Sequence, residues 1–317
     1  MQKVTITLAF ALLLAACEQS GPDSPDFESA PQRPLIALIM KSLANEFFVT
    51  MADGARAHHA EHDDRYDLIV NGIKNETDLA QQVALIDQMI ALGADAIVVA
   101  PADSKAMVPA LARAVRAGIV VVNIDNRLDA GVLGEFDLQI PFVGPDNLAG
   151  AESVGRYLAE RMNAGDKVAI LEGVPTAFNS QQRTAGFRKA AEDAGLEIVA
   201  SQSAQWDQTA AVTVTSGMLV QHPQLKAILA ANDNMALGAV AAITQAGKSG
   251  QVAVVGFDNI SAVQALIRSG DIVATADQHA DLLAVYGIEF ALEALSSGTV
   301  PEDRATPVDL VSADNLE

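Results

Sequence analysis

The sequence predicts an α/β protein in which parallel β-sheets are flanked by helices. Short apolar runs rich in β-branched residues alternate with helical stretches almost without interruption. Runs of this length and composition suit strands that are buried on both faces, as in parallel sheets. The chain has 317 residues, of which 50% are hydrophobic, so it can build one or two domains.

Eight apolar runs are the expected strands. They are LIALIM (35–40), DLIVNG (67–72), AIVVA (96–100), IVVVNI (119–124), KVAILEG (167–173), AILAAN (227–232), VAVVGF (252–257) and IVATAD (272–277). The clearest helical stretches between them are 77–93, which is expected to stop at Gly93, 146–165 and 235–247. Because one compact sheet of a domain this size normally carries fewer strands, two doubly wound parallel-sheet lobes are expected.

The first residues have the pattern of a secretion signal. Lys3 is followed by VTITLAFALLLAA, which is apolar but too short to span a bilayer. The segment ends in LAAC, which resembles a bacterial lipobox and implies that Cys17 is diacylated and becomes the mature N-terminus. We therefore expect a signal peptide at 1–16. Residues 17–32, rich in Pro, Ser and acidic side chains, are expected to be a flexible tether.

Charge and motifs argue against several function classes. The formal net charge of −20 disfavours binding to nucleic acid or to an anionic membrane surface. The chain has no G-x-S-x-G motif, no P-loop and no G-x-G-x-x-G after a strand, and its one cysteine, Cys17, precedes the folded body. His58 and His62 are spaced like metal ligands but lack the HExxH order. We expect no enzyme activity, no cofactor and no metal.

The candidate site consists of polar and aromatic residues that follow the strands, where doubly wound sheets bind ligands. They are Lys41, Asn45, Phe47, Phe48, Asp125, Asn126, Arg127, Arg183, Trp206, Asn232, Asp258 and Gln278, with Asp233 and Asn259 beside them. Adjacent helical positions point about 100° apart, so one core face cannot easily take both phenylalanines. Carboxylates, amides and arginine bind hydroxyls, and aromatic rings stack on sugar rings. Lys41 and Arg183 balance Asp125 and Asp258, which suits a neutral polyol.

The chain resembles the periplasmic sugar-binding proteins of ABC importers, in the ribose and allose branch. NEFFVTMADGA, HPQLKAILAANDNMALGA, GKSGQVAVVGFD and TPVDL have close counterparts there, and the resemblance runs from Arg33 to the end. It implies one lobe at 33–145 plus 279–307 and another at 146–278 plus 308–317. Three crossings near 145, 278 and 308 would form a hinge. The resemblance also implies that the candidate residues Asn45, Phe47, Phe48, Asp125, Arg183, Trp206, Asn232, Asp258 and Gln278 contact the sugar.

Three departures from the ribose branch indicate another monosaccharide or a polyol, such as a hexose. Ala100 stands where the ribose branch has an asparagine in its site. Asn126 stands where that branch has an arginine, and the arginine of this chain, Arg127, comes one position later. Lys41 is more like the allose-type proteins.

The expected function is that of an extracytoplasmic substrate-binding lipoprotein. It would capture a neutral monosaccharide and deliver it to an ABC importer permease with its ATPase. The alternative is a receptor that presents a sugar or a furanosyl autoinducer for chemotaxis or signalling. We expect a periplasmic or cell-surface monomer that touches the membrane through its lipid only and binds no nucleic acid. A DNA-binding regulator of this fold would carry a helix-turn-helix where this chain has the lipobox and tether.

Mass spectrometry of the mature protein should find a lipid-modified Cys17 at its N-terminus. The Cys17→Ser variant should be released from the membrane without a change in ligand affinity, because the tether separates the anchor from the fold. An unmodified N-terminus elsewhere in the chain would contradict the lipobox interpretation.

Overall fold

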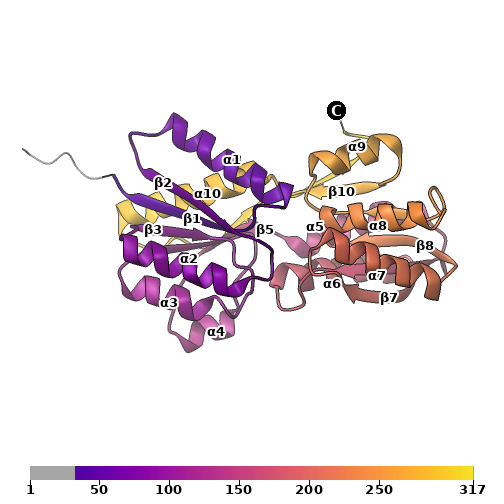
Figure 1. The fold of residues 1–317 in the computed structure, drawn as a ribbon, viewed down its shortest axis with the longest axis horizontal. Coiled ribbons are helices and arrows are strands. Elements are labelled where there is room, and N and C mark those ends of the chain that lie inside the picture. The colour runs from indigo at the N-terminus through magenta and orange to yellow at the C-terminus, as the bar shows by residue number, and fades with distance from the viewer. Residues whose placement is uncertain (1–32, 317) are drawn as a thin grey trace, which may run out of the picture. The chain divides into compact units, whose positions relative to one another are not determined.

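The protein forms two six-stranded sheets flanked by helices in the computed structural model, which describes residues 33–316. Helices and strands alternate along nearly the whole of this range (Figure 1). The predicted α/β class with two doubly wound lobes is confirmed. The predictions for the signal peptide, Cys17 and the tether concern residues outside the described range.

The first lobe is built on a sheet with the strand order β11-β5-β4-β3-β1-β2, in which every pair is parallel. Its strands are β1 (Leu35–Ser42), β2 (Asp67–Ile73), β3 (Ala96–Val99), β4 (Val120–Ile124), β5 (Phe142–Pro145) and β11 (Arg304–Thr306). Its helices are α1 (Glu46–Glu61), α2 (Leu79–Leu92), α3 (Val108–Arg116), α4 (Ala130–Glu135) and α10 (Ala280–Ser297). Helix α2 ends at Gly93, which adopts a left-handed conformation as predicted.

The second lobe is built on a sheet with the order β12-β10-β9-β8-β6-β7, parallel except for the pair of β10 and β12. Its strands are β6 (Lys167–Glu172), β7 (Glu197–Ser203), β8 (Leu225–Ala230), β9 (Ala253–Val255), β10 (Ala274–Asp277) and β12 (Asp309–Ser312). Its helices are α5 (Asn147–Ala159), α6 (Phe178–Asp193), α7 (Gln208–Gln221), α8 (Asp233–Gln245) and α9 (Ser261–Ser269).

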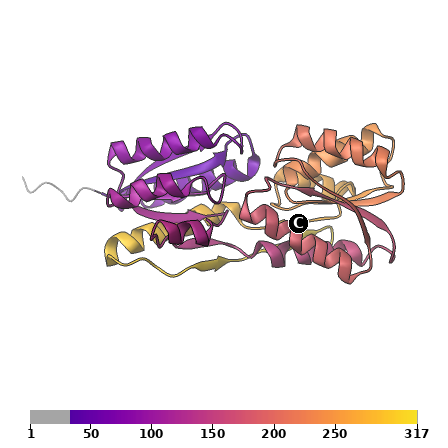
Figure 2. The ribbon, with the colours of Figure 1, turned by 90° about the horizontal axis from the view of Figure 1, so that it is seen from below.

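The chain passes between the two sheets three times: after β5, after β10 and between β11 and β12. The second passage returns α10 to the first lobe, where Figure 2 shows this yellow helix on the same side of the molecule as the indigo and purple segments. There α10 packs against α1, although the two helices are far apart in sequence. The predicted three-crossing connection is confirmed. The exact residue limits of the lobes stay a prediction.

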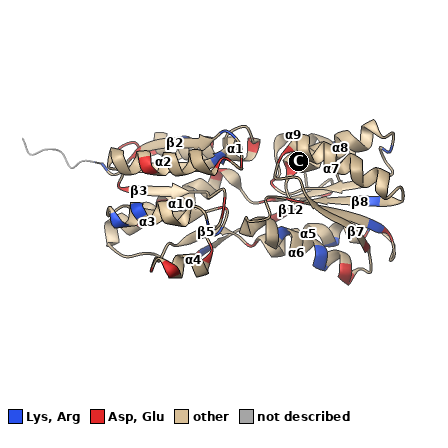
Figure 3. Ribbon diagram, turned by 60° about the horizontal axis from the view of Figure 1, so that its bottom comes forward, with Lys and Arg blue, Asp and Glu red and all other residues tan. Residues whose placement is uncertain are grey.

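Alternation along β1 shows how both faces of the first sheet become buried. Ile36, Leu38 and Met40 belong to the core on the side of α1 and α10, whereas Ala37 and Ile39 belong to the core on the side of α2 and α3. Successive side chains of a strand point to opposite faces, so a strand with helices on both sides must be apolar throughout. Figure 3 accordingly shows the charged residues mainly on helices and loops.

Four strands were not among the predicted runs: β5, β7, β11 and β12. Strands β7, β11 and β12 lie at sheet edges and carry polar or charged residues, which protect an edge from pairing with another chain. The sequence of β5 is FVGP, in which glycine and proline hide the strand signal. Among the described residues, no helix is long and apolar enough to cross a membrane.

Close packing of α5 on α6 predicts a position that tolerates no added methyl group. A Cβ atom at Gly186 would lie 2.4 Å from the Leu148 carbonyl oxygen, whereas one at Gly217 in α7 would meet nothing within 4 Å. Gly186→Ala should therefore lower the free energy of unfolding by about 1–3 kcal/mol. The matched control Gly217→Ala should raise it by about 0.5–1 kcal/mol, because alanine favours a helix. Urea denaturation measures both, and equal effects would contradict the packing argument.

Candidate functional site

A small cavity lies where the carboxyl ends of strands from both sheets converge. Each side chain that lines it belongs to a residue that is at most 9% exposed. The lining residues are Lys41, Asn45, Phe47, Phe48, Glu76, Asp125, Asn179, Arg183, Trp206, Asn232, Asp258 and Gln278. Ten of these twelve are sequence-predicted candidates, which the fold gathers from loops and helix starts of both lobes.

The start of α1 supplies the aromatic wall of the first lobe. Asn45 is the N-cap, and its Oδ1 atom accepts the N–H of Phe47 at 3.1 Å. The rings of Phe47 and Phe48 pack edge to face with their centroids 5.1 Å apart. Because α1 begins at the cavity, its first turn can place both adjacent rings in the cavity wall. This explains why two neighbouring aromatic residues occur in a chain that is 4% aromatic.

Lys41 is the buried cation of the first lobe. Its Nζ atom lies 2.9 Å from Asp125 Oδ2 and 4.0 Å from Glu76 Oε2. Burial raises the pKa of Glu76, and the charge of Lys41 opposes that rise. Glu76 Oε1 also accepts a hydrogen bond from Asn45 Nδ2 at 2.9 Å. These four side chains form one polar group on the first-lobe side of the cavity.

Arg183 is the buried cation of the second lobe, and its neighbours hold it in place. Its guanidinium donates to Asn147 Oδ1 at 2.7 Å and to the Ala231 carbonyl oxygen at 2.9 Å. The guanidinium carbon lies 3.8 Å from the ring centroid of Phe257. A planar donor fixed on three sides presents a rigid fork of N–H groups.

Asp258 is the counter-charge of Arg183. Its Oδ1 atom lies 3.3 Å from Arg183 Nη1 and accepts a bond from Gln278 Nε2 at 2.6 Å. Burial raises the pKa of Asp258 well above its ordinary value, and the charge of Arg183 opposes this rise. Burial also raises the pKa of the neighbouring Asp233 to about 7, although its carboxylate accepts the Thr275 hydroxyl at 2.8 Å.

Three lining residues have left-handed backbone conformations. The φ angles are 61° for Asp125, 66° for Trp206 and 130° for Asp258. Such conformations cost non-glycine residues about 1–3 kcal/mol each and persist only where the surroundings enforce them. Here they occur in the loops that follow β4, β7 and β9, and the side chains of all three residues line the cavity.

Several buried polar atoms of the cavity lack a hydrogen-bond partner within the described part of the chain. They are Asn179 Oδ1, Gln278 Oε1, Trp206 Nε1 and Asp125 Oδ2, the last of which is near Lys41 but outside hydrogen-bond geometry. Leaving such an atom unpaired costs about 1–3 kcal/mol, so buried polar atoms are nearly always bonded. The cavity is therefore equipped to bond a molecule that offers both donors and acceptors.

Two predicted residues, Asn126 and Arg127, do not line the cavity. Asn126 is fully buried beside it, and its side chain donates to the Pro101 carbonyl oxygen at 2.9 Å. The Arg127 side chain is 39% exposed, pairs with Asp303 at 2.6 Å and lies over the ring of Phe142. Ala100 is absent from the lining as well, so its small side chain does not widen the cavity.

Glu76 and Asn179 line the cavity but were missed. Glu76 lies three residues after the end of β2, so its place after a predicted strand is a signal that the sequence does contain. Asn179 lies four residues before Arg183 on α6, a spacing that puts both on one helix face.

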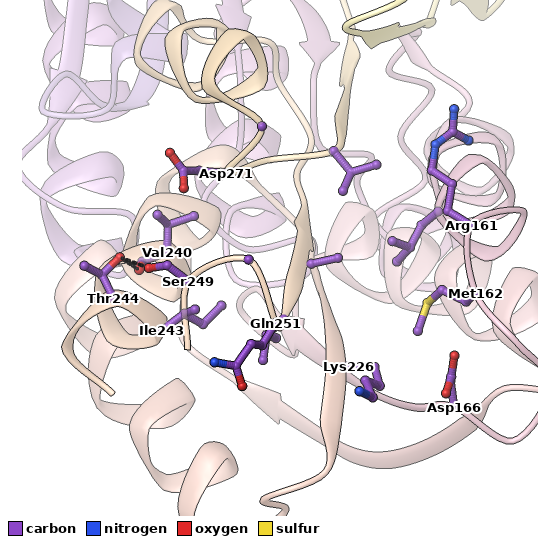
Figure 4. A pocket seen from close by; sticks show the side chains of 16 residues that line it. Arg161, Met162, Asp166, Lys226, Val240, Ile243, Thr244, Ser249, Gln251 and Asp271 are labelled. Carbon is purple, nitrogen blue, oxygen red and sulfur yellow. Dashed lines mark hydrogen bonds between the residues drawn. The ribbon is translucent and has the colours of Figure 1, made fainter. Parts of the chain in front are cut away.

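A larger cavity of about 260 Å³ lies at the amino ends of β8, β9 and β10 (Figure 4). Lys226, Asp166 and Asp271 contribute charges to its lining. Within residues 33–316, none of its side chains has a buried polar atom that lacks a partner. Ligands of doubly wound sheets bind at the opposite ends of the strands, so this cavity is not the candidate site.

Comparison with known proteins identifies the family. The model of the periplasmic binding protein domain matches residues 36–299. The chain belongs to this family. It is 53% identical over 310 residues to the D-ribose/D-allose-binding protein of Pseudomonas aeruginosa, which covers 96% of this chain and 97% of that protein. It is 32% identical to the ribose import binding protein RbsB of Bacillus subtilis, with 97% of each chain covered.

Solved structures of this periplasmic binding protein family have the same fold. An ABC transporter solute-binding protein from Burkholderia multivorans is 52% identical with a TM-score of 0.87, covering 88% of this chain and 99% of that one. A protein from Actinobacillus succinogenes with bound D-allose is 38% identical with a TM-score of 0.84, covering 89% and 98%. The resemblance seen in the sequence is confirmed, and the chain is a substrate-binding protein and not an enzyme.

Arg183→Met should lower the free energy of unfolding by about 3–5 kcal/mol near neutral pH, because the buried Asp258 carboxylate loses its counter-charge. The pKa of Asp258 is raised in the folded state, so the native protein binds the proton more tightly than the unfolded chain does. The free energy of unfolding therefore falls as the pH rises from about 3.9, the ordinary pKa of an aspartate, through the raised pKa of folded Asp258. The difference in stability between Arg183→Met and the wild type should accordingly shrink as the pH falls toward about 3.9.

The double variant Arg183→Met/Asp258→Asn is the control for this prediction. It removes both charges, so urea denaturation should show that it regains part of the stability and loses the added pH dependence. Equal stability of Arg183→Met and the wild type would show that the pair is not coupled.

Proposed function

We propose that this chain captures a neutral aldose of the ribose or allose type in the cavity between the two sheets and delivers it to an ABC importer. The observation that carries the proposal is the set of buried donors and acceptors on Asn179, Gln278 and Trp206 that have no partner among the described residues. A sugar hydroxyl both donates and accepts, so one polyol can serve all of these atoms at once.

The charges of the cavity favour a neutral ligand over an ion. Two cations, Lys41 and Arg183, face three carboxyl groups, Glu76, Asp125 and Asp258. A phosphate or carboxylate ligand would meet these buried acids, and a cationic ligand would meet both basic side chains. Hydroxyl groups bring no charge and can form charge-assisted hydrogen bonds to either kind of side chain.

The walls of the cavity favour a sugar ring. Phe47 and Phe48 face the cavity from the first lobe, and Trp206 faces it from the second. Aromatic faces of this kind stack on the C–H faces of sugar rings.

The relatives support the same ligand class. The Pseudomonas aeruginosa relative is named for D-ribose and D-allose, and the Actinobacillus succinogenes structure holds D-allose. Family membership supports a periplasmic location and partnership with an importer permease and its ATPase. A lipid on Cys17 and a monomeric state complete the proposal.

Trp206 makes the proposal testable by fluorescence, because it is the single tryptophan of the chain. Its ring lies 5.9 Å from Lys41 Nζ and 5.6 Å from the Arg183 guanidinium carbon, so a sugar between these groups should change its emission. Titration with D-allose and D-ribose should give a fluorescence midpoint equal to the dissociation constant from calorimetry. Absence of binding for both sugars would contradict the proposed ligand class.

Two variants of Trp206 separate stacking from signal. Trp206→Phe should keep most of the affinity while the optical change disappears. Trp206→Ala should weaken binding by about 1–3 kcal/mol, as the loss of a buried aromatic contact does. Arg56→Ala is the matched control, because Arg56 is on the exposed face of α1 and pairs with Asp53. Full affinity in Trp206→Ala would exclude a stacking role.

A further inference from the structure

Two helices of the second lobe begin without a cap of their own. The residues before α5, α7 and α8 are Asp146, Asp207 and Asn232, and each side chain accepts a backbone N–H of its helix at 2.7–2.9 Å. The corresponding residues of α6 and α9 are Ala177 and Ile260, whose side chains have no acceptor atom. The first N–H groups of a helix have no partner inside the helix, so α6 and α9 need acceptors from elsewhere.

The first lobe supplies the acceptors for α6. Ser104 Oγ accepts the N–H of Phe178 at 2.9 Å, and Asn126 Oδ1 accepts the N–H of Asn179 at 3.2 Å. Ser104 and Asn126 are themselves joined, because the serine hydroxyl donates to Asn126 Oδ1 at 3.3 Å. Both follow strands of the first sheet and are buried, so they are held in place before α6 meets them.

The first lobe also supplies an acceptor for α9. Glu46 Oε1 accepts the N–H of Ser261 at 2.8 Å. Glu46 is the first residue of α1, next to the cavity residues Asn45 and Phe47. A carboxylate at a helix start is favoured further by the positive end of the helix dipole.

We propose that Ser104, Asn126 and Glu46 cap α6 and α9 across the two lobes and thereby favour the closed arrangement in which the sugar is bound. When the lobes separate, these N–H groups must bond water instead, so the caps stabilise only the closed form. This inference rests on the proposed function. It makes the three side chains positioning residues, since α6 carries Asn179 and Arg183 at the cavity. It also gives Asn126 a role other than the sugar contact predicted from the sequence.

The test compares sugar binding by Ser104→Ala and Glu46→Ala with that of the wild type. Each variant should bind D-allose or D-ribose about five-fold more weakly, which corresponds to the loss of a typical helix cap. The change should be in the dissociation rate, measured by stopped-flow Trp206 fluorescence, because the caps form after the sugar has entered. Ser104→Thr and Glu46→Gln keep an acceptor atom and should restore most of the affinity.

Asp53→Ala is the matched control for Glu46→Ala. Asp53 is an exposed acid on the same helix that pairs with Arg56, so its loss should leave affinity and dissociation rate unchanged. If Ser104→Ala and Glu46→Ala both bind within about two-fold of the wild type, with unchanged dissociation rates, the caps do not stabilise closure and the inference is overturned.

Hydrogen exchange separates failure of this inference from failure of the proposed function. Peptides that contain the Phe178, Asn179 and Ser261 amides should exchange faster in the sugar-bound alanine variants than in the sugar-bound wild type, because the caps form only when the lobes are closed. If the wild type bound neither sugar, the proposed function would fail and the inference that rests on it would fail as well. If the wild type binds a sugar and the sugar-bound proteins exchange these amides at equal rates, the inference alone is overturned.

Discussion

The structure depends on five charged side chains that are buried together between two sheets. Lys41, Glu76 and Asp125 come from the first lobe, and Arg183 and Asp258 come from the second. Taking a charge out of water costs several kcal/mol unless nearby groups compensate it, on the order of the whole stability of a domain. Each lobe therefore pairs its own cation with a carboxylate and anchors the pair with neutral hydrogen bonds. Compensation within each lobe is what permits the lobes to separate without leaving a lone charge.

Compensation in this cavity is incomplete in a specific way. The ion pairs compensate charge, but amide and indole atoms of the cavity have no partner among the described residues. A neutral polyol can satisfy those atoms and adds no new charge, so the arrangement selects for hydroxyl groups. Asp125, Trp206 and Asp258 have left-handed backbone conformations that hold their side chains at the cavity. The conformational free energy that this costs is compensated by the packing of the surrounding sheets and helices.

The contacts between the two lobes are made at the same helix starts that line the cavity. In parallel α/β sheets the carboxyl ends of strands and the amino ends of helices lie at one edge, so N–H groups without partners collect beside the ligand. In α8 and α1 these groups are capped within the lobe by Asn232 and Asn45, which also line the cavity. In α6 and α9 the acceptors come from the opposite lobe. Ligand contact and lobe contact are thus made by neighbouring residues on the same turns.

The sequence by itself determined the fold class, the buried strands and most of the cavity lining. Buried parallel strands must be apolar on both faces, so β1, β3, β4 and β8 were visible as runs, and the residues after them had to lie at one edge. The tertiary structure alone decided the edge strands, whose polar residues give no such signal. It also decided the direction of each side chain within a loop. Asn126 and Arg127 follow β4 as closely as Asp125 does, but neither lines the cavity. The Asn126 side chain accepts an N–H at the start of α6, and the Arg127 side chain pairs with Asp303. That choice depends on partners far away in the chain, which no local pattern records.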